Sequence, residues 1–261
     1  VGPKMVIASR LESDSFQLLD ESTGEVAFQG QVQIQTTPIG RFHVMDFSSF
    51  QQAGDYTFRA GDQRTRPFRI DDHIWDRTIW KALNFFYAER CGVAVPGVHG
   101  KCHQDWRGHW KGDHINISGG WHDAGDLSQG LVNTSEAVYA MFDLAEAFQS
   151  QSHESRQELA DRLIEEAKWG LDWVMKTTFS DGARVHWATM RFWTNGRLGD
   201  YDDTVAEARR EPSSNFYAAA AEAIAGRVLR SREPDLAERA LKQARTDWQF
   251  GRDMLAVQPK T

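Results

Sequence analysis

The amino-acid sequence predicts two regions of different fold class, an all-β sandwich in residues 1–71 followed by an all-α region in residues 72–261. Up to position 70, short apolar or alternating segments are separated by Gly, Pro and Asp, which is typical of strands and turns. After Asp71 and Asp72 the apolar spacing becomes helical. A chain of 261 residues is long enough to form both regions.

Six strands are expected in the first region. They are the segments KMVIAS (4–9), SFQLLD (15–20), EVAFQG (25–30), RFHVMDF (41–47), DYTFRAG (55–61) and RPFRI (66–70). Six short strands without a helix predict a small sandwich. The opening VGPK has the composition of the end of an earlier strand and turn, so we expect the sandwich to lack its first strand.

Five helices are expected in the second region. The first has Trp75, Ile79, Leu83 and Phe86 on one face, with Asp72 as its N-cap. The others are expected at about 134–149, 155–177, 214–230 and 234–256. The tryptophans at helical positions are expected in the core: Trp75, Trp80, Trp169, Trp173 and Trp248. Because RPFRI passes into DDHIW without a flexible tether, the two regions should pack rigidly.

Composition excludes two classes of partner. The formal net charge of −7 argues against nucleic acid, which needs a concentrated basic surface. No run of about 18 apolar residues predicts a membrane span, and the first residues are not a signal peptide.

Long polar loops at 92–130 and 178–213 separate the helices, and loops of this length are usually functional. The segment from Cys91 to His122 holds both cysteines and five of the nine histidines of the chain. Cys91, Cys102 and His103 with one later histidine, best His122, would complete a tetrahedral zinc site. A disulfide, or two unrelated buried thiols, are the alternatives.

The segment SGGWHDAGDLSQG (118–130) places two carboxylates in a glycine-flanked loop. Gly125 allows the backbone to curl, so Asp123 and Asp126 can converge and hold one water. The alternatives are a helix cap with an Asx turn, or calcium binding.

The loop ARVHWATMRFWTNGRLGDYDD (183–203) combines aromatic faces with polar donors. This mixture suits a sugar-binding cleft, although the tryptophans could equally fill gaps between helices. The candidate substrate-binding residues are His186, Trp187, Arg191 and Trp193. Asp200, Asp202 and Asp203 are a further candidate for calcium, but a solvated loop is the favoured interpretation.

The motif GGWHDAGD at 119–126, together with the upstream cysteines and histidine, resembles the family 9 glycoside hydrolases. These are inverting enzymes, mostly endo-β-1,4-glucanases. The resemblance implies an immunoglobulin-like domain ahead of an (α/α)6 barrel. It also implies that Asp126 is the general base, that Asp123 positions the water, and that zinc is structural. Such a glucanase would be secreted, periplasmic or on the cell surface.

A complete (α/α)6 barrel has twelve helices, whereas about five are expected here, so the chain is expected to hold only about the first half. The family's general acid is a glutamate near the end of the barrel, and no glutamate of this chain is assigned that role. The fragment alone is therefore expected to be inactive. Two rival hypotheses remain, a zinc hydrolase and a noncatalytic carbohydrate-binding protein.

Overall fold

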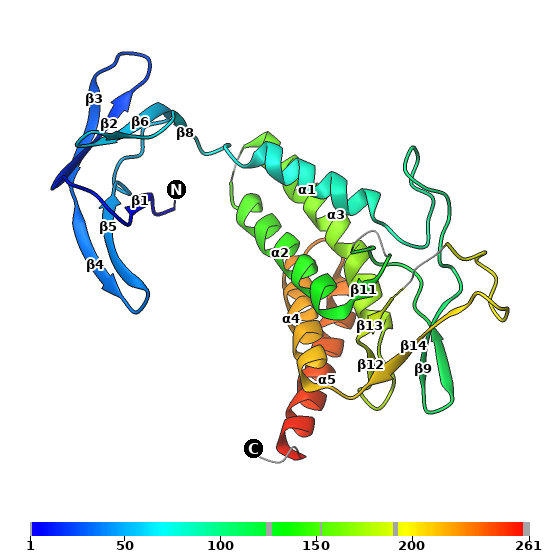
Figure 1. Ribbon diagram of the computed structural model, residues 1–261. Helices are drawn as coiled ribbons and strands as arrows, with labels where there is room; N and C mark the ends of the chain where they lie inside the picture. Colours follow the sequence, from blue (N-terminus) through cyan, green and yellow to red (C-terminus); the bar gives the residue numbers. More distant parts are fainter. Residues whose placement is uncertain (1, 124–126, 152, 190–192, 258–261) are drawn as a thin grey trace. The chain divides into compact units, whose positions relative to one another are not determined.

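The computed structural model describes residues 2–123, 127–151, 153–189 and 193–257. The chain divides into two compact units, Val1–Thr78 and Ile79–Thr261. Each is described separately below (Figure 1).

The first unit is a sandwich of two antiparallel sheets. One sheet has the order β1-β5-β4, and the other has the order β3-β2-β6-β7 with β8 also paired to β6. The strands are β1 Met5–Ala8, β2 Ser15–Asp20, β3 Val26–Gln31, β4 Gln33–Thr37, β5 Gly40–Asp46, β6 Gly54–Ala60, β7 Gln63–Arg64 and β8 Phe68–Ile70. Apolar side chains from both sheets form one core, in which the Phe16 and Phe58 rings stack at 5.0 Å.

All six expected strands form. The sequence analysis missed β4 and β7. The β4 segment QIQTT is largely exposed and has no alternation of apolar and polar residues, and β7 has only two residues. Both are recognisable only from their pairing with β5 and β6.

Five helices carry the core of the second unit. They are α1 Asp76–Ala88, α2 Leu131–Gln149, α3 Glu154–Lys176, α4 Pro212–Val228 and α5 Pro234–Val257. Short connections join α2 to α3 and α4 to α5, which makes two helical hairpins (Figure 1). Pro212 and Pro234 begin α4 and α5, where a missing N–H costs nothing.

The expectation that all helical tryptophans are buried is wrong for two of them. Trp75 is 66% exposed because it precedes α1 rather than lying within it. Trp248 is 54% exposed, and its ring meets that of Phe216 at 5.1 Å. Trp173 is fully buried as expected.

The two long segments between the helices contain strands that the sequence analysis did not foresee. They are β9 Trp106–Trp110, β10 Asp113–Asn116, β11 Gln129–Gly130, β12 Arg184–Val185, β13 Trp187–Ala188 and β14 Thr204–Arg209. One sheet has the order β10-β9-β14-β12, with β14 parallel to β9, and β11 pairs with β13. These strands are short and rich in polar residues, so no local apolar pattern marks them. They can be recognised only from their pairing with distant parts of the sequence.

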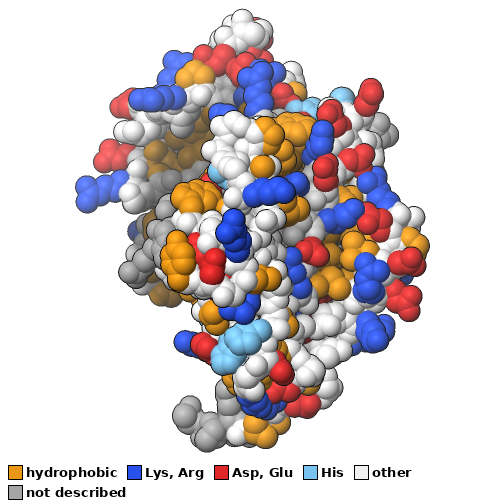
Figure 2. All heavy atoms as spheres, turned by 90° about the vertical axis from the view of Figure 1, so that its right-hand side faces the viewer, with side chains coloured by type: hydrophobic (Ala, Val, Ile, Leu, Met, Phe, Trp, Pro, Cys, Tyr) orange, Lys and Arg blue, Asp and Glu red, His pale blue; other side chains and the backbone are white. Residues whose placement is uncertain are grey.

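None of the described helices is long and apolar enough to cross a membrane. On the face drawn in Figure 2, Lys and Arg side chains are interspersed with Asp and Glu rather than gathered in one stripe.

Candidate metal centre and active-site loop

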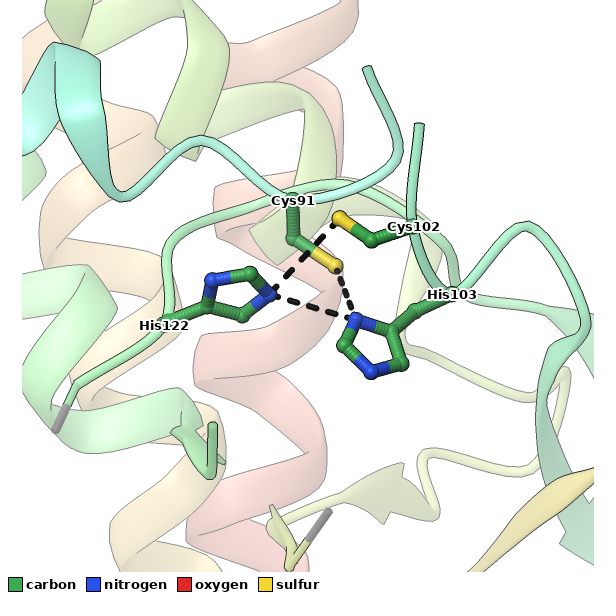
Figure 3. Close-up of side chains that lie close together, drawn as sticks. All are labelled: Cys91, Cys102, His103 and His122. Atoms are coloured by element: carbon green, nitrogen blue, oxygen red, sulfur yellow. Dashed lines mark hydrogen bonds between the residues drawn. The ribbon is translucent and has the colours of Figure 1, made fainter. Parts of the chain in front are cut away.

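Four side chains from three places in the sequence meet in one buried cluster, which we call the Cys2His2 set. Its members are Cys91, Cys102, His103 and His122. One ligand atom from each lies within 4.8 Å of the others, and no member is more than 2% exposed. Figure 3 shows both sulfurs and both imidazoles pointing toward a common centre.

The separations fit a tetrahedral zinc ion. Ligands at about 2.3 Å for sulfur and about 2.0 Å for nitrogen lie about 3.3–3.8 Å apart around such a centre. Cys91 Sγ is 3.6 Å from His103 Nδ1, and Cys102 Sγ is 3.9 Å from His122 Nε2. The two imidazole nitrogens are 3.2 Å apart. Both cysteines are free thiols, so the structure has no disulfide between them.

Backbone pairing brings Cys91 next to His122. The Cys91 amide donates to the Gly120 carbonyl, and the His122 amide donates to the Glu89 carbonyl, each at 2.9 Å. Two indoles of α3 hold the same strand-like segment, because Trp169 Nε1 donates to the Gly120 carbonyl and Trp173 Nε1 donates to the Ile117 carbonyl. Helix α3 therefore holds the segment that places Cys91 beside His122.

The thiols are poised as metal ligands. Hydrogen bonding from Cys91, His103 and His122, together with the Gly92 amide, lowers the pKa of the Cys102 thiol well below its usual range. Burial raises the pKa of Cys91, and the neighbouring Cys102 thiolate acts in the same direction. A dication at the centre would bind both sulfurs as thiolates, so its binding would release the protons that the thiols hold.

The loop with the two candidate catalytic carboxylates begins directly after His122. The Asp123 amide donates to the Ser128 carbonyl at 2.9 Å, which closes the base of this loop, and the Asp123 side chain is exposed. Asp126 lies outside the described residues. The next helix, α2, begins at Leu131 with Gly130 as its N-cap, so it does not use Asp126 as a cap.

Three of the four candidate substrate-binding residues are described, and they lie in two places. Trp187, on β13, packs against Gly130, since a Cβ at Gly130 would lie 2.4 Å from the indole ring. The His186 carbonyl accepts from the Leu131 amide, while its Nδ1 lies 2.7 Å from Ser214 Oγ. Both therefore lie beside the end of the Asp123 loop. Arg191 is outside the described residues.

Trp193 occupies a different position. Its ring stacks on His103 at 5.5 Å and 18°, and it also meets His122 edge-on. With 54% of its surface exposed, Trp193 covers the Cys2His2 set rather than filling a gap between helices.

The sequence analysis predicted only part of a second cluster, which consists of three aspartates. Asp202 and Asp203 were expected in a solvated loop, but their side chains are buried and meet Asp105. One carboxylate oxygen from each lies within 4.8 Å of the others. Asp105 is 97 residues from Asp202 in sequence and carries no local motif, so sequence patterns gave no signal of this contact.

Comparison with known proteins decides the family. The model for glycosyl hydrolase family 9 matches residues 75–260, and the model for the cellulase N-terminal Ig-like domain matches residues 2–65. This chain belongs to glycosyl hydrolase family 9. Its first unit is the Ig-like domain, and its helices correspond to about half of a family 9 (α/α)6 barrel.

Individual relatives of this family 9 chain are distant and longer. Endoglucanase C of Cellulomonas fimi is 27% identical over 95% of this chain and 27% of its own length. Endoglucanase D of Acetivibrio thermocellus is 25% identical over 80% of this chain and 37% of its own length. The crystal structure of a Zn-binding triple mutant of the family 9 endoglucanase J30 has a TM-score of 0.64 at 24% identity. The match covers 97% of this chain and 52% of the J30 chain. The chain therefore spans about half the length, or less, of these relatives.

Proposed function

We propose that the protein, in its full encoded length, hydrolyses internal β-1,4 bonds of a glucan with inversion at the anomeric carbon. Family membership supports the reaction class. The substrate class is supported by relatives named endoglucanase, cellodextrinase and cellulose 1,4-beta-cellobiosidase. The observation that carries the proposal is the position of Asp123, exposed in a loop that runs from the buried His122 to β11.

In the proposed mechanism, Asp126 accepts a proton from the water that attacks the anomeric carbon, and Asp123 orients that water. Inversion needs a second carboxyl group about 6.5–9.5 Å from the base to protonate the leaving oxygen. We assign this role to no glutamate of the 261 residues. His186 and Trp187 lie beside the base of the same loop, where an imidazole and an indole face can hold sugar rings.

We further propose that the Cys2His2 set holds zinc in a structural role. Four protein ligands complete a tetrahedral shell and leave no position for a water, which argues against a zinc hydrolase. The ion would join Cys91, which follows α1, to His122 at the start of the proposed catalytic loop. Glu89 Oε2 lies 3.9 Å from His122 Nδ1, so it favours the ring orientation with Nε2 toward the centre. With a polymeric glucan as substrate, the protein would act outside the cytoplasm.

The test is the release of reducing ends from a soluble β-glucan by the full encoded protein. Asp126→Asn keeps the shape of the side chain but cannot accept the proton, so we expect turnover to fall by about 10²–10⁴-fold. Asp123→Asn should lower it by a smaller factor. Asp113→Asn, which changes an exposed carboxylate on β10, is the matched control and should keep the parental rate.

Two further results decide between the proposal and its rival. Azide should partly restore turnover in Asp126→Ala, because a small anion can occupy the vacated space. A noncatalytic carbohydrate-binding protein would bind glucan oligosaccharides and release no reducing ends at any protein concentration. Near-parental rates in both Asn variants would exclude a catalytic role for this loop.

A further inference from the structure

Three buried carboxylates meet at the junction of β9 with the segment 193–203. Asp105 is fully buried, and Asp202 is 7% exposed. The side chain of Asp203 is 5% exposed. Since one oxygen from each lies within 4.8 Å of the others, mutual repulsion among them has to be compensated.

Two oxygens of this cluster lack a partner. Asp202 Oδ1 and Asp203 Oδ1 are both buried, and neither receives a hydrogen bond from the described residues. The other oxygens are satisfied. Asp202 Oδ2 accepts from the Asn195 amide at 2.8 Å, and Asp203 Oδ2 accepts from the Gly199 amide at 2.8 Å. A buried carboxylate oxygen without a donor is rare in proteins and requires an explanation, of which a bound ion is one.

Among the residues that the structure describes, the acidic groups near the cluster outnumber the basic ones, since Arg197 acts on Asp200 and one further arginine contacts Asp203. Arg107 Nη2 lies 2.6 Å from Asp203 Oδ2 and supplies one positive charge against three carboxylates. Asp200 adds a fourth carboxylate beside Asp202, and the contact between these two raises the pKa of Asp202. The remaining charge on the three buried groups is close to that of one divalent cation.

We propose that Asp105, Asp202 and Asp203 form a second metal site, separate from the Cys2His2 set, which binds a calcium ion. Calcium is bound by oxygen ligands, tolerates irregular geometry and takes six to eight ligands, so carbonyls and waters can complete its shell. Magnesium demands a near-ideal octahedron and dehydrates reluctantly. Zinc prefers the sulfur and nitrogen donors found in the Cys2His2 set.

This site would hold the segment that carries Trp193. Asp105 already accepts from Thr194 Oγ1 at 2.5 Å and from the Gly196 amide at 2.9 Å. Trp193 is adjacent to Thr194 and stacks on the zinc-site residue His103. The calcium ion would therefore fix one end of a loop whose other end rests on the Cys2His2 set.

The experiment measures calcium binding by calorimetry and by melting temperature. It uses the full encoded protein, passed over a chelating resin, with its zinc content matched among variants. Asp202→Asn retains an oxygen that can accept from the Asn195 amide, so the fold should be preserved. We expect this variant to bind one calcium ion fewer than the parent, or to bind it at least tenfold more weakly, and to lose the calcium-dependent rise in melting temperature. Asp203→Asn should behave alike.

Asp113→Asn is the matched control, because it removes the same charge from an exposed site on β10 that lies outside the cluster of three. It should keep the parental number of calcium ions. The proposal is overturned if the parent shows no saturable binding of calcium at millimolar concentration. Parental binding by Asp202→Asn and Asp203→Asn would also overturn it. An equal loss in Asp113→Asn and Asp202→Asn would indicate diffuse attraction to an acidic surface rather than a site.

Discussion

Trp121 donates a 2.7 Å hydrogen bond from its indole Nε1 to Oε1 of Glu166, in the middle of α3. The same carboxylate receives Nε and Nη2 of Arg90 at 3.1 and 2.8 Å. Arg90 and Trp121 each precede a member of the Cys2His2 set, and they pair as an isolated antiparallel bridge. One buried glutamate on a helix thus fixes the spacing between Cys91 and His122 before any metal is bound.

Replacing this glutamate should loosen the metal centre. Glu166→Gln removes the charge that faces Arg90 and leaves fewer acceptors, so we expect a loss of about 1.5–3 kcal/mol of unfolding free energy. Zinc should also dissociate faster in a competition with a chelator. The neighbouring Glu165→Gln breaks an exposed pair with Arg162 and should change stability by less than about 0.5 kcal/mol. Equal stability of the two variants would show that Glu166 does not hold the segment.

Gly170 gives a second test of the same contact, because Trp121 packs directly on it. A Cβ at position 170 would lie 2.2 Å from the indole ring. Helix propensity alone would make Gly170→Ala stabilising by about 1 kcal/mol. We expect the opposite sign, a destabilisation of about 1–3 kcal/mol, because the ring must be displaced. Urea unfolding measures it, with Glu158→Ala on the exposed side of α3 as the control. A more stable Gly170→Ala would contradict the packing.

The metal ligands were accessible from the sequence because three of the four lie in recognisable local patterns. Cys102 and His103 are adjacent, and His122 directly precedes Asp123 in a glycine-flanked motif. The residues that hold these ligands in place could not be predicted from the sequence. Glu166 lies 76 residues from Arg90 and 45 from Trp121, and nothing in a helical pattern marks it as a buried ion-pair partner. The strands β9 and β14 were missed for the same reason, since 98 residues separate His109 from Glu207.

Removing the metal should lower stability as well as activity. If the Cys2His2 set joins the end of α1 to the active-site loop, a chelator should lower the melting temperature by several degrees, since about 1 kcal/mol corresponds to about 2–4 °C in a domain of this size. Cys102→Ser should give the same melting temperature with or without the chelator. His99→Ala changes an imidazole whose ring is 5.8 Å from that of His122 but which is outside the set, so it should retain zinc. If the chelator left the melting temperature of the parent unchanged but reduced its turnover, the metal would be catalytic instead of structural.

A buried ion network ties β12 to the helical hairpin of α4 and α5, and its two acids should behave differently. Arg184 Nε and Nη2 lie 2.8 and 2.5 Å from the two oxygens of Asp247, and Nη2 also lies 3.0 Å from Glu222. All three side chains are fully buried. Burial acts to raise the pKa of Asp247, but its bonds and charge interaction with Arg184 outweigh burial, so the net pKa is lowered. For Glu222, burial dominates and raises the pKa well above its usual value.

These opposite shifts predict opposite effects of the two amide substitutions. Asp247→Asn leaves the guanidinium without its main counter-charge and should cost about 3–5 kcal/mol at neutral pH. Asp247 stabilises the fold above its unfolded-state pKa, and that contribution is lost as the pH falls through its lowered pKa. Glu222 contributes most below its unfolded-state pKa, and its contribution is lost as the pH rises through its raised pKa.

Glu222→Gln mimics the protonated acid at every pH, and Glu222 Oε2 has no hydrogen-bond partner among the described residues. Relative to the parent, this variant should therefore gain stability as the pH rises from acidic to alkaline values. Urea unfolding of both variants and the parent across that range measures the effect. If the free-energy difference between Glu222→Gln and the parent stayed constant, or moved in favour of the parent with rising pH, Glu222 would be ionised in the folded protein.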